Sequence, residues 1–126
     1  MAVQKKEFGA LASGEQVFLY TITNQKGESV SLTDYGASVV SLLVKDREGA
    51  LRDIVLGCDN AAAYEQQTAC LGGVPGRHAN RIAAGRFVLN GKTYKLEQNN
   101  GENHLHGGSH GFHRRLWQGY ADGQDS

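Results

Sequence analysis

Short segments rich in β-branched and aromatic residues recur along the chain, and polar turn signals separate them. Residues 16–23 (QVFLYTIT) form one such segment, which ends at the turn signal NQKG. Residues 29–36 follow, with Val30 and Leu32 alternating with polar positions. These patterns predict two strands that are neighbours in the sequence.

The longest apolar run lies within residues 37–46. Its β-branched content and the turn signal at residues 47–49 favour a strand that is buried on both faces. Residues 51–57 (LRDIVLG) predict a further short strand that ends at a glycine. Residues 59–67, with several alanines and glutamines, are the one segment that favours a helical turn or two.

The dipeptide Asn90-Gly91 predicts a β-hairpin, because it favours the type I′ turn and is flanked by strand-forming residues at 87–89 and 93–96. In total the pattern predicts five to seven short strands and almost no helix, hence an all-β fold. There is no internal repeat or domain boundary, and residues 120–126 read as a solvated tail or an interrupted loop. We therefore expect residues 1–126 to form a single segment of one domain.

Composition narrows the class of ligand. The chain has 17 glycines and one proline, which indicates many tight turns. Lysine plus arginine equals aspartate plus glutamate at 13 each, so nothing favours nucleic acid or an anionic membrane as a partner. No signal-peptide h-region follows the basic N-terminus, and no apolar run approaches a membrane span. We expect a cytoplasmic protein.

Two segments carry residue types suited to chemistry. The first is residues 76–82 (GRHANRI), where two arginines and an asparagine lie beside glycine. Arginine offers five donors in a fixed fork, and asparagine offers both donors and an acceptor, which suits sugar hydroxyls, carboxylates or phosphates. No Gly-Lys-Ser/Thr ending supports a phosphate-binding loop. Alternatively, these side chains brace a long loop by binding backbone carbonyls.

The second segment holds four histidines, His104, His106, His110 and His113. In a strand, His104 and His106 would point to one face, as metal ligands from one strand must. However, no HExxH motif, cysteine or closely spaced carboxylate accompanies them, so the metal signal is weak. A cupin-like metal site remains one alternative. A second alternative is hydrogen bonding or acid–base chemistry at a sugar ring. A third is that some of these histidines are simply polar surface residues.

Taken together, these segments resemble the aldose 1-epimerase (galactose mutarotase) family. The matching motifs run in order along nearly the whole chain. They are Tyr35-Gly36-Ala37, DIVLG at 53–57, Tyr64, GRxANRI at 76–82, NGKTYKL at 90–96, NxLHGGxxGF at 103–112, and Trp117. The pair of GRxANRI and LHGG, some twenty residues apart, is highly specific, although neither motif is so alone.

The resemblance implies a galactose-mutarotase-like β-sandwich, of which this chain is the N-terminal part. It also implies an isomerase that interconverts the α and β anomers of hexoses such as galactose and glucose by acid–base ring opening. In this family the Asn-Arg pair and the histidine of LHGG contact the sugar, which assigns substrate binding to Asn80, Arg81 and His106. His106 is also the candidate for an assisting catalytic role. No metal or organic cofactor is implied, and a small aldohexose is the expected partner.

The resemblance also implies that part of the catalytic apparatus is missing. The principal acid histidine, a substrate-binding aspartate and the base glutamate of the family have no match among these residues. Loss of one member of such a pair forfeits about 10²–10⁴-fold in rate, so we expect weak or no activity. An exposed sheet edge would favour self-association. The alternative function is a non-catalytic carbohydrate-binding β-domain that uses the same three residues.

Overall fold

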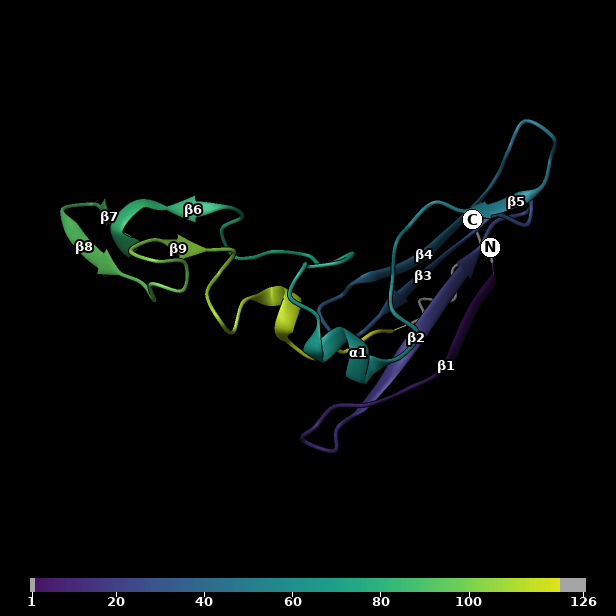
Figure 1. The fold of residues 1–126 in the computed structure, drawn as a ribbon, viewed down its shortest axis with the longest axis horizontal. Coiled ribbons are helices and arrows are strands. Elements are labelled where there is room, and N and C mark those ends of the chain that lie inside the picture. The colour runs from purple at the N-terminus through teal and green to yellow at the C-terminus, as the bar shows by residue number, and fades with distance from the viewer. Residues whose placement is uncertain (1, 121–126) are drawn as a thin grey trace. The chain divides into compact units, whose positions relative to one another are not determined.

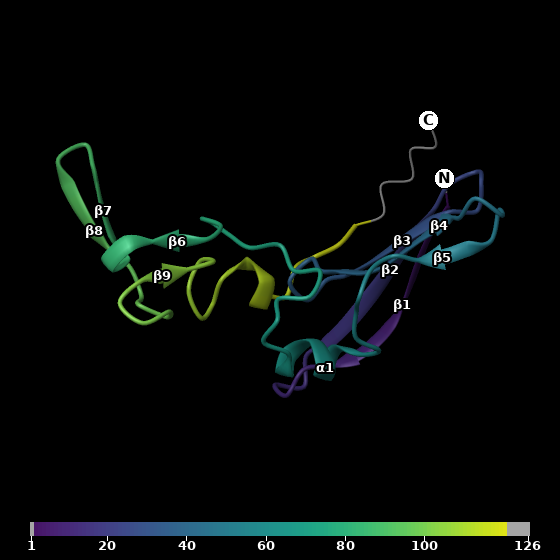
Figure 2. The same cartoon turned by 45° about the horizontal axis from the view of Figure 1, so that its top comes forward.

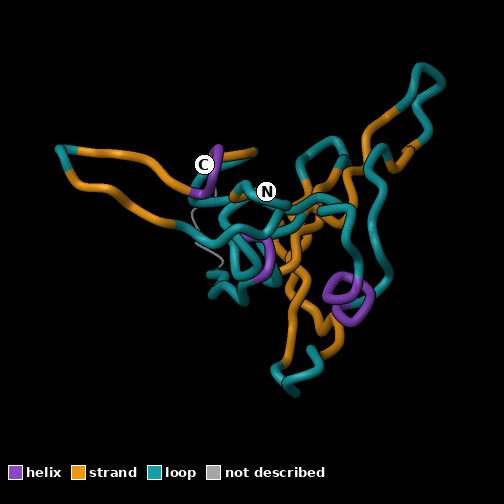
Figure 3. The backbone as a smooth tube through the Cα atoms, turned by 60° about the vertical axis from the view of Figure 1, so that its left-hand side comes forward, coloured by secondary structure: helices purple, strands orange, loops and turns teal. Residues whose placement is uncertain are grey.

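The computed structural model describes residues 2–120, which form two compact units. One unit consists of residues 2–73 and 116–120, and the other of residues 74–115. The regular secondary structure of both units is mostly strand, with little helix, as Figure 3 shows by colour. Among the described residues, the one α-helix, α1, spans only Ala61–Gln66, which confirms the predicted all-β class. The predicted tail at 120–126 lies outside the described residues, except for Tyr120.

The first unit is built on a five-stranded antiparallel sheet whose strands follow one another in chain order (Figures 1 and 2). Its strands are β1 (Ala2–Ala10), β2 (Gln16–Thr23), β3 (Ser29–Thr33), β4 (Val39–Lys45) and β5 (Leu51–Asp53). The strand predicted at 51–57 is shorter than expected. It ends at Asp53, whose Oδ1 accepts hydrogen bonds from the backbone amides of Leu42 and Val55, each at 3.0 Å.

Strand β1 is the longest element that the hydrophobic pattern does not predict. Along its nine residues only Phe8 is buried, so no alternation of apolar and polar residues marks it. An edge strand has one unpaired side and tolerates such a pattern, and Lys5 and Lys6 are typical of edges that resist further pairing. Its pairing with β2 supplies the regular structure that the sequence pattern does not reveal.

The core of the first unit lies where β1 and β2 meet α1. Its buried apolar side chains are Phe8, Val17, Leu19, Tyr35, Ala61 and Tyr64. The helix begins after Asn60, whose Oδ1 accepts from the amide of Ala63 at 2.9 Å and so satisfies an otherwise unpaired helix donor. This confirms the helical segment predicted within residues 59–67. None of the helices in the described part of the chain is long and apolar enough to cross a membrane.

Strand β4 is less buried than predicted. Its residues 39–44 are all half-buried, whereas the continuous apolar run predicted a strand covered on both faces. Of this strand, Val40 packs against the core, which is built mainly from β1, β2 and α1. The apolar pattern correctly predicts a strand but overestimates how much of it this chain covers.

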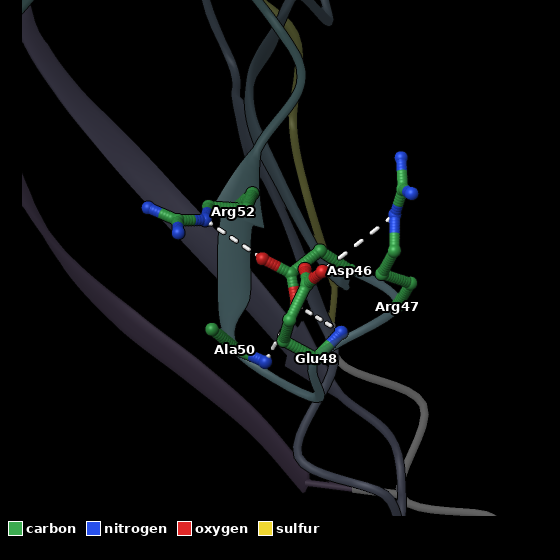
Figure 4. A network of polar contacts seen from close by, with 5 residues as sticks. All are labelled: Asp46, Arg47, Glu48, Ala50 and Arg52. Carbon is green, nitrogen blue, oxygen red and sulfur yellow. Dashed lines mark hydrogen bonds and ion pairs between the residues drawn. The ribbon is translucent and has the colours of Figure 1, made fainter.

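Asp46 organises the turn between β4 and β5 (Figure 4). Its Oδ1 accepts from the backbone amides of Glu48 at 3.0 Å and Ala50 at 2.9 Å, and its Oδ2 accepts from Nε of Arg52 at 3.0 Å. The Arg52 hydrogen bond, followed by the backbone amides, lowers the pKa of Asp46. An Asx-type turn therefore fixes the β4–β5 hairpin.

The second unit contains two antiparallel strand pairs and two short 3₁₀ turns. The pairs are β6 (Arg81–Ile82) with β9 (His104–Leu105), and β7 (Arg86–Leu89) with β8 (Lys92–Lys95); the turns are η1 (Ala83–Gly85) and η2 (Phe112–Arg114). Asn90 and Gly91 join β7 to β8 with φ of 51° and 73°, which confirms the predicted type I′ hairpin. Phe87 and Tyr94 face each other across this hairpin, and their rings stack at 5.1 Å.

Candidate functional site

The two motifs of the sequence analysis meet through the short strand pair β6–β9. Arg81 lies opposite Leu105, and Ile82 lies opposite His104. Neither two-residue strand has a sequence pattern long enough to be predicted. Their pairing places the residue before β6, Asn80, beside the residue after β9, His106, so the three predicted site residues lie together at one end of this ladder.

Asn80 and His106 are held together by two hydrogen bonds. The backbone amide of Asn80 donates to Nδ1 of the His106 imidazole at 2.9 Å, and the amide of His106 donates to the carbonyl oxygen of Asn80 at 3.1 Å. Both residues have left-handed backbones, with φ of 67° for Asn80 and 52° for His106. Asparagine and histidine are among the residues that tolerate this region best. The two motifs are therefore joined through one backbone bond and one side-chain bond.

This arrangement selects one tautomer of His106. Because Nδ1 accepts a hydrogen bond from a backbone N–H, it carries no proton, and the proton of the neutral ring lies on Nε2. The half-buried His106 ring therefore presents Nε2–H as a hydrogen-bond donor. The backbone geometry thus determines what the side chain can offer a ligand.

Arg81 is exposed, but its guanidinium is held on one side. Its Nε donates to Oδ1 of Asn100 at 2.8 Å, and its Nη1 donates to Oδ1 of Asn80 at 3.3 Å. Of the five N–H donors of an arginine, these bonds use two, and the remaining three lie on Nη1 and Nη2. The planar fork therefore keeps adjacent donors for a ligand such as a vicinal diol.

Asparagines to which the sequence analysis assigns no role support this site. Asn99 makes two hydrogen bonds to the backbone of Leu105. Its Oδ1 accepts from the Leu105 amide at 2.7 Å, and its Nδ2 donates to the Leu105 carbonyl at 2.9 Å. Asn103 accepts from the amide of Ala84 at 3.1 Å. The signal that could have found them is the repetition of asparagine in a polar segment just before LHGG, since amide side chains can substitute for missing backbone partners.

Glu97 braces the loop that follows His106. Its Oε2 accepts from the amide of Ser109 at 2.8 Å, and its backbone carbonyl lies 2.8 Å from Nδ1 of the buried His104. The hydrogen bonds from Ser109 lower the pKa of Glu97, with the imidazoles of His104 and His110 contributing less. His104 therefore has a structural role in the fold of this unit.

Two glycines of the motifs are required by close backbone approach. A Cβ atom on Gly107, which has φ of 87°, would collide with the carbonyl group of Gly76. A Cβ on Gly76 would collide with the ring of Phe112, whose amide donates to the Gly76 carbonyl at 3.1 Å. The glycines of GRxANRI and LHGG thus let the two loops pack directly on each other.

A cleft of about 350 Å³ also lies in the second unit, and the three predicted site residues do not line it. Its lining includes Arg77, Arg115 and Phe112. The guanidinium carbons of Arg77 and Arg115 lie 5.3 and 6.0 Å from the centre of the Phe112 ring, within cation–π range. Both arginines therefore pack against Phe112 and help to hold the loop in place.

The histidine cluster does not assemble as a shared ligand set in the described residues. The alternation that would place His104 and His106 on one face ends at Leu105, because His106 has a left-handed backbone. No group of three His, Cys, Asp or Glu side chains within residues 2–120 is placed to hold a metal ion. His113 has a buried Nδ1 without a hydrogen-bond partner in this part of the chain, and burial lowers its pKa.

Comparison with known proteins shows which family these motifs represent. The profile of the aldose 1-epimerase family matches residues 19–125. The aldose 1-epimerase of Escherichia coli (strain K12) is 42% identical over 113 residues, which cover 89% of this chain and 33% of that protein. The galactose mutarotase of Bos taurus is 50% identical over 88 residues, which cover 70% of this chain and 26% of that protein. The chain thus spans about a quarter to a third of the length of these curated relatives.

Solved structures agree with the sequence comparison. A GalM/aldose epimerase homologue from C. elegans has a TM-score of 0.73 and 37% identity, covering 78% of this chain and 30% of that chain. The galactose 1-epimerase of Lactobacillus acidophilus NCFM has a TM-score of 0.79 and 25% identity, covering 98% of this chain and 36% of that chain. The predicted galactose-mutarotase-like fold is confirmed. Because the family profile covers most of its residues, the chain belongs to the aldose 1-epimerase family.

Proposed function

We propose that this chain binds an aldohexose through Asn80, Arg81 and His106, as a substrate-binding part of an aldose 1-epimerase. The observation that carries the proposal is the joining of the two motifs by the Asn80–His106 hydrogen bonds beside the β6–β9 pair. This pairing gathers an amide, a guanidinium and an imidazole, whose donors and acceptors differ in geometry. Such a set suits a neutral ring with several hydroxyl groups.

The chemistry of each group supports a sugar ligand. The free guanidinium edge of Arg81 can donate to two adjacent hydroxyl oxygens. The Nε2–H of His106 donates to one further sugar oxygen, and the Asn80 side-chain amide offers both a donor and an acceptor. Formal net charge is zero for the whole chain, so recognition rests on these local hydrogen bonds rather than on a charged surface.

The family reaction defines what these residues would assist. A base takes the proton of the anomeric hydroxyl while an acid protonates the ring oxygen, and the bond between C1 and the ring oxygen breaks to give the open-chain aldehyde. Rotation about C1–C2 and the reverse proton transfers close the ring as the other anomer. In this scheme Arg81 and Asn80 orient the sugar, and His106 assists through its Nε2 donor.

We further propose that residues 1–126 form an N-terminal segment of the aldose 1-epimerase β-sandwich and have little or no mutarotase activity by themselves. The residues that match the family motifs supply sugar contacts, whereas none of them matches its main acid histidine or base glutamate. General acid–base catalysis is worth about 10²–10⁴-fold, so losing that pair would leave only weak acceleration. The alternative function is a non-catalytic carbohydrate-binding β-domain. It would be favoured if a longer protein that contains this chain bound sugar without converting it.

A titration with D-galactose followed by ¹H–¹⁵N NMR tests the binding proposal. We expect saturable shifts of the amides at 80, 81 and 106, and a loss of affinity of about tenfold in Arg81→Lys, which removes the planar fork. Arg86→Lys is the matched control, because Arg86 is an exposed arginine of the same unit outside the site. Equal affinities for the two variants, or shifts confined to other residues, would contradict the proposal.

Polarimetry tests the catalytic part. We expect the chain to change the mutarotation rate of α-D-glucose only slightly above the uncatalysed rate. A rate comparable with that of a longer family member would show that the chain contains a working acid–base pair.

A further inference from the structure

The orientation of Arg81 depends on a residue outside both motifs. Its Nε–H donates to Oδ1 of Asn100 at 2.8 Å, which is shorter than the 3.3 Å bond from Nη1 to Asn80. A hydrogen bond with a charged donor is about twice as strong as one between neutral groups. An exposed arginine otherwise samples many rotamers, so a fixed acceptor at Nε limits the directions of its fork.

Asn100 is well placed to act as such an acceptor, because its own backbone is fixed. Its amide donates to the carbonyl of Asn103 at 3.0 Å, and the amide of Asn103 donates back to Asn100 at 3.0 Å. Gly101, with φ of 59°, provides the turn between them. Asn103 in turn is tied to the amide of Ala84, three residues beyond Arg81. The half-buried Asn100 therefore belongs to a turn that is anchored beside β6.

We propose that Asn100 is a positioning residue, which holds the guanidinium of Arg81 by its Nε so that the Nη edge faces the sugar. This inference rests on the proposed function, since Arg81 is there assigned to sugar binding. Occupation of Nε and one Nη1 proton leaves three N–H groups, on Nη1 and Nη2, without a partner in the part of the chain that the structure describes.

The chemistry of an amide acceptor fits this role. A neutral oxygen orients the guanidinium without neutralising its charge, so the outer N–H groups keep the stronger, charge-assisted bonds to hydroxyl oxygens. A carboxylate at the same position would hold Nε equally well but would compete for the outer donors. Asn100→Asp is therefore a variant that preserves the positioning contact, whereas Asn100→Ala removes it.

The first test needs no sugar. Exchange of the Arg81 Nε–H with water is measured by ¹H–¹⁵N NMR on the full chain, with the resonance assigned from its absence in Arg81→Lys. We expect exchange at least tenfold slower than for Nε–H of Arg86, and an increase to the Arg86 rate in Asn100→Ala. Asn100→Asp retains slow exchange. Gln98→Ala, which removes a side-chain bond to the Ala84 carbonyl in the same segment, leaves it unchanged.

Fast exchange of the Arg81 Nε–H in the unmodified chain would overturn the inference, and this measurement remains decisive even where Asn100→Ala does not fold. Unchanged slow exchange in a folded Asn100→Ala would also overturn it. Backbone amide spectra show whether each variant is folded.

The second test uses D-galactose affinity and a double-mutant cycle. We expect Asn100→Ala to weaken binding about three- to tenfold in the unmodified background and to have no further effect in Arg81→Lys, because lysine has no Nε–H donor. An equal loss in both backgrounds would show a merely structural role and overturn the inference. If the unmodified chain binds no galactose, the proposed function fails, while the exchange measurement still decides whether Asn100 positions Arg81.

Discussion

The backbone amide of Asn80 donates a hydrogen bond to Nδ1 of His106 at 2.9 Å, which couples the two motifs and selects the imidazole tautomer. The donor is a main-chain group, so it is present with any residue except proline at position 80. A neutral His106 therefore carries its proton on Nε2, and a ligand that binds this nitrogen must offer an acceptor. Sugar hydroxyl and ring oxygens meet that requirement.

We expect His106→Asn to weaken D-galactose binding about three- to tenfold while leaving the unfolding free energy within about 1 kcal/mol. The asparagine Oδ1 can replace Nδ1 as acceptor for the Asn80 amide, and asparagine tolerates the left-handed backbone at this position. It has no group at the place of Nε2–H. Imidazole ¹⁵N shifts of the unmodified chain provide the companion measurement, and an Nδ1–H tautomer there would contradict the assignment.

Gly107→Ala should destabilise the second unit much more than Gly91→Ala. Both glycines have positive φ, 87° and 73°, so both substitutions carry a backbone penalty of about 1–2 kcal/mol. Only at Gly107 does the new Cβ also collide with the Gly76 carbonyl, whereas nothing lies within 4 Å at Gly91. We expect the first substitution to exceed the second by about 1–3 kcal/mol in urea unfolding. Equal losses would show that the two loops are not closely packed.

Stability should fall as the pH drops below about 6.5, and His113 should contribute to this loss. Burial, with smaller effects of Arg114 and His106, lowers the native pKa of His113 from its ordinary value of 6.5. The folded chain then binds fewer protons at this site than the unfolded chain, so its contribution is complete above 6.5 and disappears as the pH falls through the native pKa. Urea unfolding at pH 7.5 and 5.5 measures the effect.

His113→Gln is the comparison for that pH series, since glutamine does not titrate. The difference in unfolding free energy between the two pH values should be smaller in this variant than in the unmodified chain. If the two pH-dependent differences in unfolding free energy were equal, a group other than His113 would be responsible for the loss of stability.

Self-association should occur through β5 rather than β1. Both are edge strands of the five-stranded sheet, but β1 carries Lys5 and Lys6, which discourage further pairing. Beyond β5, Ile54 and Leu56 are 63% and 77% exposed, leaving apolar surface beside that edge. Sedimentation velocity on the chain should show dimers or larger species at micromolar concentration.

Substitutions at two residues of similar exposure distinguish association through β5 from association through β1. Leu51 on β5 is 45% exposed and Val3 on β1 is 42% exposed. Leu51→Lys should shift the distribution toward monomer, whereas Val3→Lys should leave it unchanged. A monodisperse monomer for the unmodified chain would refute the prediction outright.

Local chemistry explains why several elements can be predicted from the sequence. Residues 16–23 form β2 because their β-branched and aromatic side chains suit a pleated surface, and Asn90-Gly91 forms the predicted hairpin because both residues adopt positive φ. The helix at Ala61–Gln66 follows from alanines and an asparagine cap. Each of these signals lies within a few residues of the structure that it predicts.

Other features have no local signal. Strand β1 forms because β2 offers it an edge, and β4 is only half-buried because the core lies mainly at β1, β2 and α1. The apolar pattern indicates that a strand could be buried, but not how much of it the rest of the chain covers. Burial is therefore decided by the tertiary structure.

The sequence by itself determined the all-β class, the hairpin, and the order of motifs that marks the aldose 1-epimerase family. Only the tertiary structure decided how Asn80, Arg81 and His106 come together, which tautomer His106 adopts, and which asparagine holds the arginine. The physical reason is that these properties depend on hydrogen bonds between residues 19 to 26 positions apart. Such contacts depend on how the chain folds back on itself, which short-range patterns do not encode.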